Sequence, residues 1–296
     1  RGARRFLAAS RLFMGTSATV MVDQCTQTRA RVRRTREAGR IIRVKRRREF
    51  WYGTARSVLR PLLRLAFRWR MEGLDNIPPS GGVIVACNHI SVLDPFAHAL
   101  FVDSAGRKVR MLGKAEVFRV FGVGRILRGA RQIPVQRGSA DASRALEPAV
   151  DALRFGEAVA IYPEGTVTHN EDLTLMAGRT GVARLALATG APVICCAVWG
   201  THACLPRRRK ARWRPGLVIA VRAGTPVDLS QFAGKPMDAQ TLQGATTAVM
   251  EDLSALVADV RLSWKPPRWA RLWPEVENWR PSGSEPGGDG GRKPRS

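Results

Sequence analysis

Short apolar runs alternate with longer amphipathic stretches between residues 71 and 264. The apolar runs have the length and composition of buried strands, whereas the stretches between them space their apolar side chains as helices do. The predicted strands are 71–79, which ends in a turn, 83–87, 109–114, 131–137, 158–163 and 217–222. The predicted helices are 95–102, 116–121, 139–155 and 239–264. This alternation predicts an α/β layered domain with a mainly parallel central sheet, whose functional site lies at the edge of that sheet.

Residues 50–70 have a different pattern, in which aromatic and aliphatic side chains alternate with arginines. The arginines recur every four residues, at Arg56, Arg60, Arg64 and Arg68. This spacing predicts a basic amphipathic helix, with Pro61 as a candidate break. Four arginines argue against a membrane-spanning helix and favour one that lies in the membrane interface, with its guanidinium groups on lipid phosphates. The alternative is a helix that packs on the domain and turns its arginines to water.

The formal net charge of +25 predicts attraction to a polyanion, either nucleic acid or an anionic membrane surface. Residues 1–49 carry 15 arginines and lysines against three acidic residues, so this tail is predicted to be disordered. The apolar run 6–22 is interrupted by Arg11, which argues against a signal peptide, and Met14 and Met21 are candidate start positions.

Changes in composition divide the chain into four segments. The expected segments are a tail at 1–49, the interfacial helix at 50–70, the main domain at 71–265 and a second tail at 266–296. The second tail begins with tryptophans interleaved with basic residues, which fit either an interfacial anchor or a segment wrapped on the domain. From Pro281 its Gly, Pro, Ser and Arg content predicts disorder.

The five cysteines are odd in number and form no CxxC pair. Most of them lie in apolar, strand-like runs, so we expect reduced core thiols in a cytosolic protein, with neither a disulfide framework nor a zinc site. The sequence contains no metal-ligand cluster and no P-loop. We therefore expect no metal, no cofactor and no nucleotide hydrolysis.

The run 83–87 leads into the most informative polar residues of the chain. His89 follows this predicted strand, and Asp94 precedes Pro95 and a predicted helix, which makes Asp94 a candidate helix cap. The turn between them can bring the carboxylate back towards the imidazole. A carboxylate that orients an imidazole forms a general-base pair. The alternative is a strand-to-helix turn in which Asp94 only caps and His89 is only a satisfied polar group.

Three further blocks follow this one in order. They are Ile133-Pro134-Val135 with Arg137, Tyr162-Pro163-Glu164-Gly165-Thr166, and Ala191-Pro192-Val193 leading to Gly200. Together with Asn88, His89 and Asp94 in NHxxxxD order, they resemble the four ordered blocks of the glycerolipid acyltransferases. More narrowly, residues 70–225 are similar to the bacterial 1-acylglycerol-3-phosphate acyltransferases.

The resemblance implies a role for each matching residue. It implies that His89 is the general base and that Asp94 orients it. It places Arg131 or Arg137 on the phosphate of the acceptor, and the segment 192–198 beside the acyl donor. The remaining implied substrate-binding residues are Asn88, Glu164, Gly165 and Thr166.

One position departs from the family pattern. The family often has Arg after Glu-Gly-Thr, whereas this chain has Val167, and Arg179 is a candidate substitute as a phosphate ligand. The predicted reaction transfers an acyl group from a thioester, on coenzyme A or acyl carrier protein, to a lysophospholipid such as 1-acylglycerol-3-phosphate in phospholipid biosynthesis. An acceptor without phosphate, such as a glycolipid, is the alternative that Val167 leaves open.

The expected partners are an anionic membrane surface, the lysophospholipid and the thioester, and the expected location is peripheral, on the cytoplasmic face of the cell membrane. A basic nucleic-acid-binding protein is the rival class. The basic residues of 50–70 are interleaved with long aliphatic side chains, and no nucleic-acid module is recognisable, so we expect no nucleic acid.

Overall fold

The computed structural model describes residues 52–54, 56–135, 144–206 and 216–265. In this part of the chain seven strands form one sheet, in the order β1-β7-β6-β2-β5-β3-β4. The strands are β1 (Arg68–Glu72), β2 (Val83–Cys87), β3 (Val109–Lys114), β4 (Ile133–Val135), β5 (Ala158–Ile161), β6 (Val193–Trp199) and β7 (Val218–Pro226).

The central part of the sheet is parallel. Strands β6, β2, β5, β3 and β4 run in one direction, whereas β7 is antiparallel to β6 and carries β1 with it. This arrangement confirms the predicted α/β fold with a mainly parallel sheet. Because the five central strands are parallel, their carboxyl ends all meet at one edge of the sheet.

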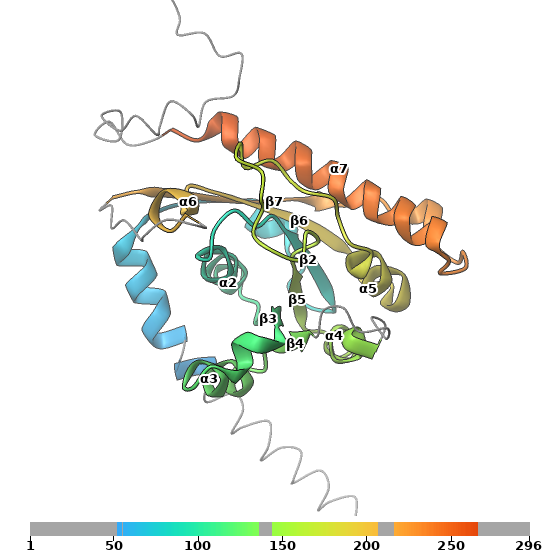
Figure 1. Cartoon of the computed structure of the whole chain (residues 1–296), viewed down its shortest axis with the longest axis horizontal. Coiled ribbons are helices and arrows are strands. Elements are labelled where there is room, and N and C mark those ends of the chain that lie inside the picture. Colours follow the sequence, from blue (N-terminus) through green and yellow to red (C-terminus); the bar gives the residue numbers. More distant parts are fainter. Residues whose placement is uncertain (1–51, 55, 136–143, 207–215, 266–296) are drawn as a thin grey trace, which may run out of the picture. The chain divides into compact units, whose positions relative to one another are not determined.

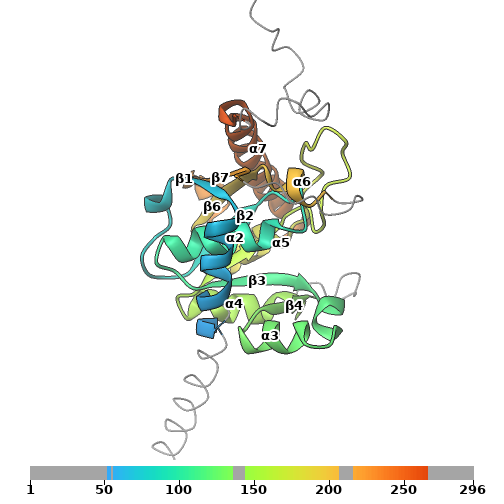
Figure 2. The same cartoon turned by 90° about the vertical axis from the view of Figure 1, so that its left-hand side faces the viewer.

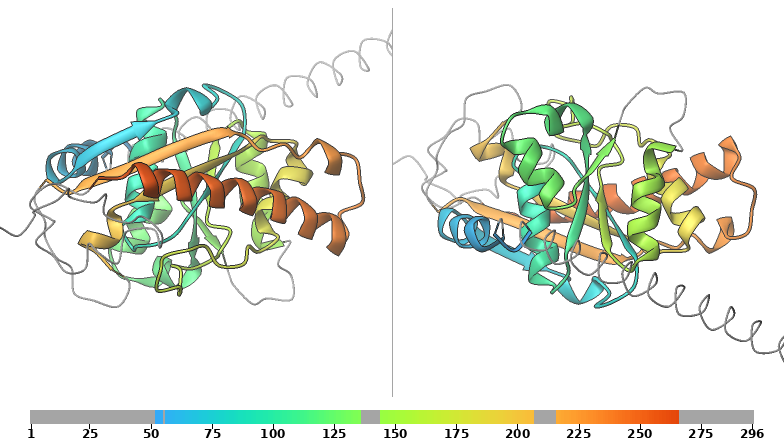
Figure 3. Two further views of the ribbon diagram at one scale, coloured as in Figure 1. Left: turned by 90° about the horizontal axis from the view of Figure 1, so that it is seen from above. Right: turned by 90° about the horizontal axis from the view of Figure 1, so that it is seen from below.

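Helices cover both faces of this sheet (Figure 1). Helix α7 (Ala239–Ser263) packs along β6 and β7, and α5 (Gly181–Thr189) and α4 (Glu147–Arg154) continue the same layer, while α2 (Asp94–Ser104) packs on the opposite face. Figure 3 shows α7 and α2 on the two sides of the strands. The short helices are η1 (Leu74–Asn76), η2 (Ala115–Arg119), η3 (Arg144–Leu146), α3 (Val123–Gly129), α6 (Thr201–Cys204) and η4 (Ser230–Phe232).

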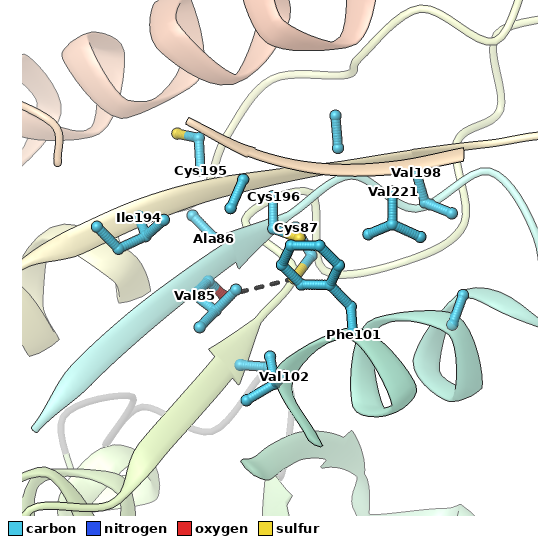
Figure 4. Packing of buried hydrophobic residues seen from close by; sticks show 14 of the residues in the cluster. Val85, Ala86, Cys87, Phe101, Val102, Ile194, Cys195, Cys196, Val198 and Val221 are labelled. Atoms are coloured by element: carbon cyan, nitrogen blue, oxygen red, sulfur yellow. Dashed lines mark hydrogen bonds between the residues drawn. The ribbon is translucent and has the colours of Figure 1, made fainter. Parts of the chain in front are cut away.

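The core lies where α2 meets the central strands. Every residue of β2 is completely buried, and its neighbours β5 and β6 are buried along their whole length. Phe101 of α2 lies near Cys87, the last residue of β2 (Figure 4). The four described cysteines are reduced and buried, as predicted, and Cys25 lies outside the described residues.

Several predicted elements differ from the observed ones. The helix expected at 116–121 is the 3-10 turn η2, which ends before Gly122 at a φ of 75°, and α3 follows it. The strand expected at 71–79 is β1 with η1, and β1 begins earlier, at Arg68. The described part of the helix expected at 139–155 is η3 with α4, and α5 was not anticipated.

Residues 56–66 are helical, as expected from the arginine spacing, and Pro61 does not interrupt the helix. Arg56 and Arg60 both reach Asp103 at the end of α2, with Arg56 Nε 2.6 Å from Asp103 Oδ1. Leu63 and Phe67 are buried, whereas the apolar side chains of Val58, Leu62 and Leu65 face outward. The helix therefore packs on the domain through part of its basic face and keeps an exposed apolar stripe. No helix in the described ranges is long and apolar enough to cross a membrane.

Candidate active site

His89 and Asp94 lie at the carboxyl end of β2, at the edge where the parallel strands end. The Nδ1 atom of His89 is 3.0 Å from Oδ2 of Asp94. Asp94 is completely buried, while the side chain of His89 keeps 14% of its surface exposed. An ionised carboxylate only accepts hydrogen bonds, so Nδ1 carries the ring proton and Nε2 carries a lone pair. The pair therefore has the geometry of a base whose tautomer is fixed.

The carboxylate of Asp94 is held by three further donors. Its Oδ2 atom accepts the backbone N–H groups of Ile90 (2.6 Å) and Ser91 (2.7 Å), and Oδ1 accepts the hydroxyl of Thr201 (2.5 Å). The sequence suggested that Asp94 caps the helix, but Asp94 is itself the first residue of α2. Its carboxylate turns back onto the preceding turn and does not cap the helix. The side chain is fixed before any substrate arrives.

Thr201 reaches Asp94 from the carboxyl end of the neighbouring strand β6. It follows β6 at Gly200, which has a φ of 99° and lies so close to Val218 that a Cβ would be 2.4 Å from the carbonyl oxygen of Val218. Only glycine fits this crossing. No local pattern in the sequence marks Thr201, since its partner Asp94 lies more than 100 residues away in the chain.

The ring of Tyr162 stacks on the ring of His89. Their centroids are 4.2 Å apart and their planes differ by 24°. The hydroxyl of Tyr162 lies 3.1 Å from Nδ1 of His98, and Nε2 of His98 lies 3.2 Å from the carbonyl oxygen of Cys196. Because that carbonyl only accepts, Nε2 of His98 donates to it and Nδ1 accepts from Tyr162. Burial raises the pKa of Tyr162 well above its usual value, so the hydroxyl keeps its proton. His98 is thus a buried, bonded residue and belongs to neither the surface nor the reacting pair.

Glu164 holds the backbone around the site. Its Oε1 atom accepts the N–H of His89 (3.1 Å) and its Oε2 atom accepts the N–H of Met176 (2.9 Å). Only 3% of Glu164 is exposed, and burial raises its pKa to about 7. The carbonyl of His89 accepts the N–H of Thr168 at 2.7 Å, so the segment after Glu164 also holds His89. Both oxygens of Glu164 are therefore occupied by the protein's own backbone.

The other residues of the first and third blocks also lie at this edge. The side chain of Asn88 is buried and bonds the backbone of Val198 in both directions, at 2.7 and 3.1 Å, which extends the pairing of β2 with β6. Gly165 has a φ of 75° and lies against the side chain of Arg179, which is exposed. Thr166 is half-buried beside them.

The structure separates Arg131 from these residues. Arg131 precedes β4, and its Nη1 atom bonds Oε1 of Glu157 at 2.8 Å, just before β5 begins. Both residues therefore lie at the amino end of the parallel strands, opposite His89. The expectation that Arg131 contacts the acceptor phosphate is corrected by this ion pair. Arg137 lies outside the described residues, two positions after β4 ends at Val135.

Lys114 is a further basic residue at the carboxyl edge of the sheet, and its position is evident only from the fold. It ends β3 at the same edge as His89, and its side chain is half exposed. In the sheet order, β5 lies between β2 and β3, so the two strand ends are about 10 Å apart. Among the described residues, no group of three or more His, Cys, Asp or Glu side chains could hold a metal ion.

Comparisons with known proteins agree with this geometry. The family model described as Acyltransferase matches residues 68–199, which include β1 to β6. The 1-acyl-sn-glycerol-3-phosphate acyltransferase of Bacillus subtilis is 26% identical over 205 residues, covering 69% of this chain and 96% of that protein. The protein of the same name from Borreliella burgdorferi is 29% identical over 133 residues, covering 45% of this chain and about half of its own length.

A solved structure shares the fold. The 1-acyl-sn-glycerophosphate acyltransferase PlsC from Thermotoga maritima superposes with a TM-score of 0.55 at 24% identity, covering 78% of this chain and 84% of that one. The family match covers the segment that carries His89, Asp94 and Glu164. Residues 68–199 therefore match the Acyltransferase family, and the chain is similar to proteins named 1-acyl-sn-glycerol-3-phosphate acyltransferase.

Proposed function

We propose that this enzyme transfers a fatty acyl group from a thioester to the free hydroxyl of a lysophospholipid such as 1-acylglycerol-3-phosphate, in phospholipid biosynthesis. The observation that carries the proposal is the His89–Asp94 pair at 3.0 Å, with Nε2 of His89 free of that bond and His89 partly exposed. The names of the Bacillus and Borreliella relatives support the choice of acceptor.

In the proposed reaction Nε2 of His89 takes the proton of the acceptor hydroxyl as its oxygen attacks the thioester carbonyl. The tetrahedral intermediate collapses by breaking the carbon–sulfur bond. The thiolate that leaves takes the proton back from the imidazolium, so the base is restored at the end of the cycle. Asp94 stabilises the imidazolium in between. The steps need no covalent acyl-enzyme, no metal and no cofactor.

Three basic residues are candidates for holding the acceptor phosphate. Arg179 lies against Gly165, Lys114 ends β3, and Arg137 follows the carboxyl end of β4 in the chain. Arginine can bind a phosphate through two parallel charge-assisted hydrogen bonds. Arg179 is therefore suited to take the role of the arginine that the family often has where this chain has Val167. The matching test is Arg179→Lys, which should raise the KM for the acceptor and leave the KM for the thioester unchanged.

The proposed location is the cytoplasmic face of the membrane, as a peripheral protein. The exposed apolar stripe of residues 56–66, with Arg64 exposed beside Leu65, supports this location. A helix of this kind binds an anionic lipid surface through apolar burial and basic side chains together.

The experiment is an acyl-transfer assay of the full chain against lysophosphatidic acid, other lysophospholipids and a glycolipid, with acyl-coenzyme A and acyl carrier protein as donors. His89→Ala should lower kcat about 100- to 10,000-fold. His169→Ala is the matched control, because His169 is an exposed histidine on the loop that follows β5. If the enzyme acylates a phosphate-free acceptor at the same rate, the proposed acceptor would be a glycolipid and not a lysophospholipid. Full activity of His89→Ala would refute the mechanism.

A further inference from the structure

A group of apolar side chains stands exposed on η2, the turn after it and α3. Its members, which we call the η2–α3 surface, are Val117, Val120, Phe121, Val123 and Ile126. Phe121 is fully exposed, with a relative accessibility of 102%. Single exposed apolar residues are ordinary, but five within ten consecutive residues form a patch that indicates an interaction site.

The backbone that carries this surface is firmly built. Phe118 is buried beneath it, and Gly124 packs on η2 so closely that a Cβ would be 1.9 Å from the carbonyl oxygen of Phe118. Nη1 of Arg128 bonds the same carbonyl. The apolar side chains are therefore held outward by packed neighbours, and η2 and α3 lie beside β3 and β4 (Figure 2).

The exposed charges of η2 and α3 are basic except for Glu116, which lies 3.8 Å from Nζ of Lys114. Arg119, Arg125 and Arg128 are exposed among the apolar residues, and the sequence has no acidic residue between Glu116 and Asp141. A second copy of this chain would bring the same arginines against each other, which opposes self-association. Apolar side chains flanked by arginines match an anionic lipid surface, which offers acyl chains below and phosphates above.

The η2 part of this surface lies at the same end of the strands as His89. η2 begins at Ala115, immediately after β3 ends, and β3 is parallel to β2 in the same sheet. A membrane in contact with η2–α3 would therefore face the edge where the strands end at His89, Glu164 and Lys114.

We propose that the η2–α3 surface is a membrane contact, separate from the helix at 56–66, that inserts Phe121 and its apolar neighbours among the acyl chains of an anionic bilayer. The arginines bind the lipid phosphates, and the contact turns the carboxyl edge of the sheet towards the membrane in which a lysolipid acceptor resides. This last step rests on the proposed function, whereas the lipid contact itself does not.

The test measures binding of the full chain to vesicles of phosphatidylglycerol mixed with phosphatidylcholine, by cosedimentation without substrate. Phe121→Asp should weaken binding on the order of tenfold, because it removes the burial of one aromatic side chain. Phe121→Trp should retain binding. Phe155→Asp is the matched control, because Phe155 is also exposed (82%) but lies just before β5, at the opposite edge of the sheet.

Charge is tested in the same assay. Arg125→Glu should weaken binding to the anionic vesicles more than Arg154→Glu, which changes an exposed arginine of α4. The proposal is overturned if Phe121→Asp binds as tightly as Phe155→Asp. It is also overturned if the protein is a dimer without lipid and Phe121→Asp makes it a monomer, because the surface would then be covered by a second copy.

An activity readout separates this proposal from the proposed function. With an acceptor dispersed in detergent, Phe121→Asp should keep its kcat, while with an acceptor embedded in anionic vesicles its rate should fall in parallel with binding. Vesicle binding that depends on Phe121, in a protein that acylates none of the acceptors, would refute the proposed function and leave the membrane contact standing.

Discussion

The two ends of the central parallel strands differ in what their charged side chains contact. At the amino ends, Arg110 and Arg131 share Glu157, with Arg110 bonding both carboxylate oxygens at 2.8 and 2.9 Å. Arg107 beside them donates to the carbonyl groups of Pro78, Gly81 and Gly156. At the carboxyl ends, Asp94 and Glu164 accept mainly from backbone N–H groups.

This difference indicates that the charged residues of the amino edge stabilise the fold, whereas those of the carboxyl edge serve the reaction. The amino edge ties charged side chains to one another and to carbonyl groups, so they stabilise the joins between strands and loops. The carboxyl edge uses the backbone to satisfy its carboxylates, which leaves Nε2 of His89 available to a substrate. The backbone N–H groups that serve Asp94 and Glu164 come from turns that follow β2 and β5. We therefore expect that losing a charge at the amino edge affects stability and leaves the reaction at the carboxyl edge unchanged.

The largest effect is expected at the carboxyl edge. Asp94→Asn keeps an oxygen for the N–H groups of Ile90 and Ser91 and an amide for Thr201, so the variant should fold. It removes the charge that stabilises the imidazolium of His89, and kcat should fall on the order of 1,000-fold. Steady-state kinetics beside a thermal unfolding curve checks this. A kcat within a few-fold of the wild type would show that Asp94 only shapes the turn.

The amino edge should give the opposite result. Glu157→Gln leaves the guanidinium of Arg110, which is 4% exposed, without its counter-charge. We expect the free energy of unfolding to fall by about 3 kcal/mol, with kcat nearly unchanged. Urea unfolding followed by circular dichroism measures the loss, and Glu147→Gln, at the start of α4, is the exposed control. A large fall in kcat for Glu157→Gln, without a loss of stability, would show that the amino edge also contributes to the reaction.

The pH dependence of stability should show the effect of the raised pKa of Glu164. Its pKa is raised to about 7 by burial, above the 4.5 of an ordinary glutamate, so the folded chain binds this proton more tightly than the unfolded chain does. The stability from this proton is fully present below pH 4.5 and is lost as the pH rises from there to about 7, a change of about 3 kcal/mol. The difference in unfolding free energy between the wild type and Glu164→Gln should follow this course. A difference that stays constant with pH would contradict the raised pKa.

The sequence predicted those parts of the fold and site that depend on neighbours in the chain. Strands and helices with clear apolar patterns lie where expected, and the His89–Asp94 contact forms within one turn. The direction of β4 also carried information about Arg131, which precedes this strand. A parallel strand puts its first residue on the edge opposite His89, and Glu157 holds Arg131 there.

Long-range contacts could not be predicted in this way. Thr201 meets Asp94, and Tyr162 meets both His89 and His98, only because β2, β5 and β6 are adjacent in the sheet. Nothing in a single sequence fixes that order of strands. The basic helix at 56–66 was predicted, but its use of Arg56 and Arg60 to bind Asp103 depends on the position of α2.

The smallest effect is expected at Tyr162, where two variants separate the ring from the hydroxyl. Tyr162→Phe keeps the stacked ring but leaves Nδ1 of the buried His98 without its donor, so the free energy of unfolding should fall by about 1 kcal/mol and kcat should hold. Tyr162→Leu also removes the ring that fixes the orientation of His89, so kcat should fall several-fold in addition. The two variants are compared by kcat at saturating substrate and by urea unfolding. Equal kcat values for Phe and Leu at this position would mean that Asp94 alone orients the imidazole, and that the stacked ring serves only the packing of the carboxyl edge.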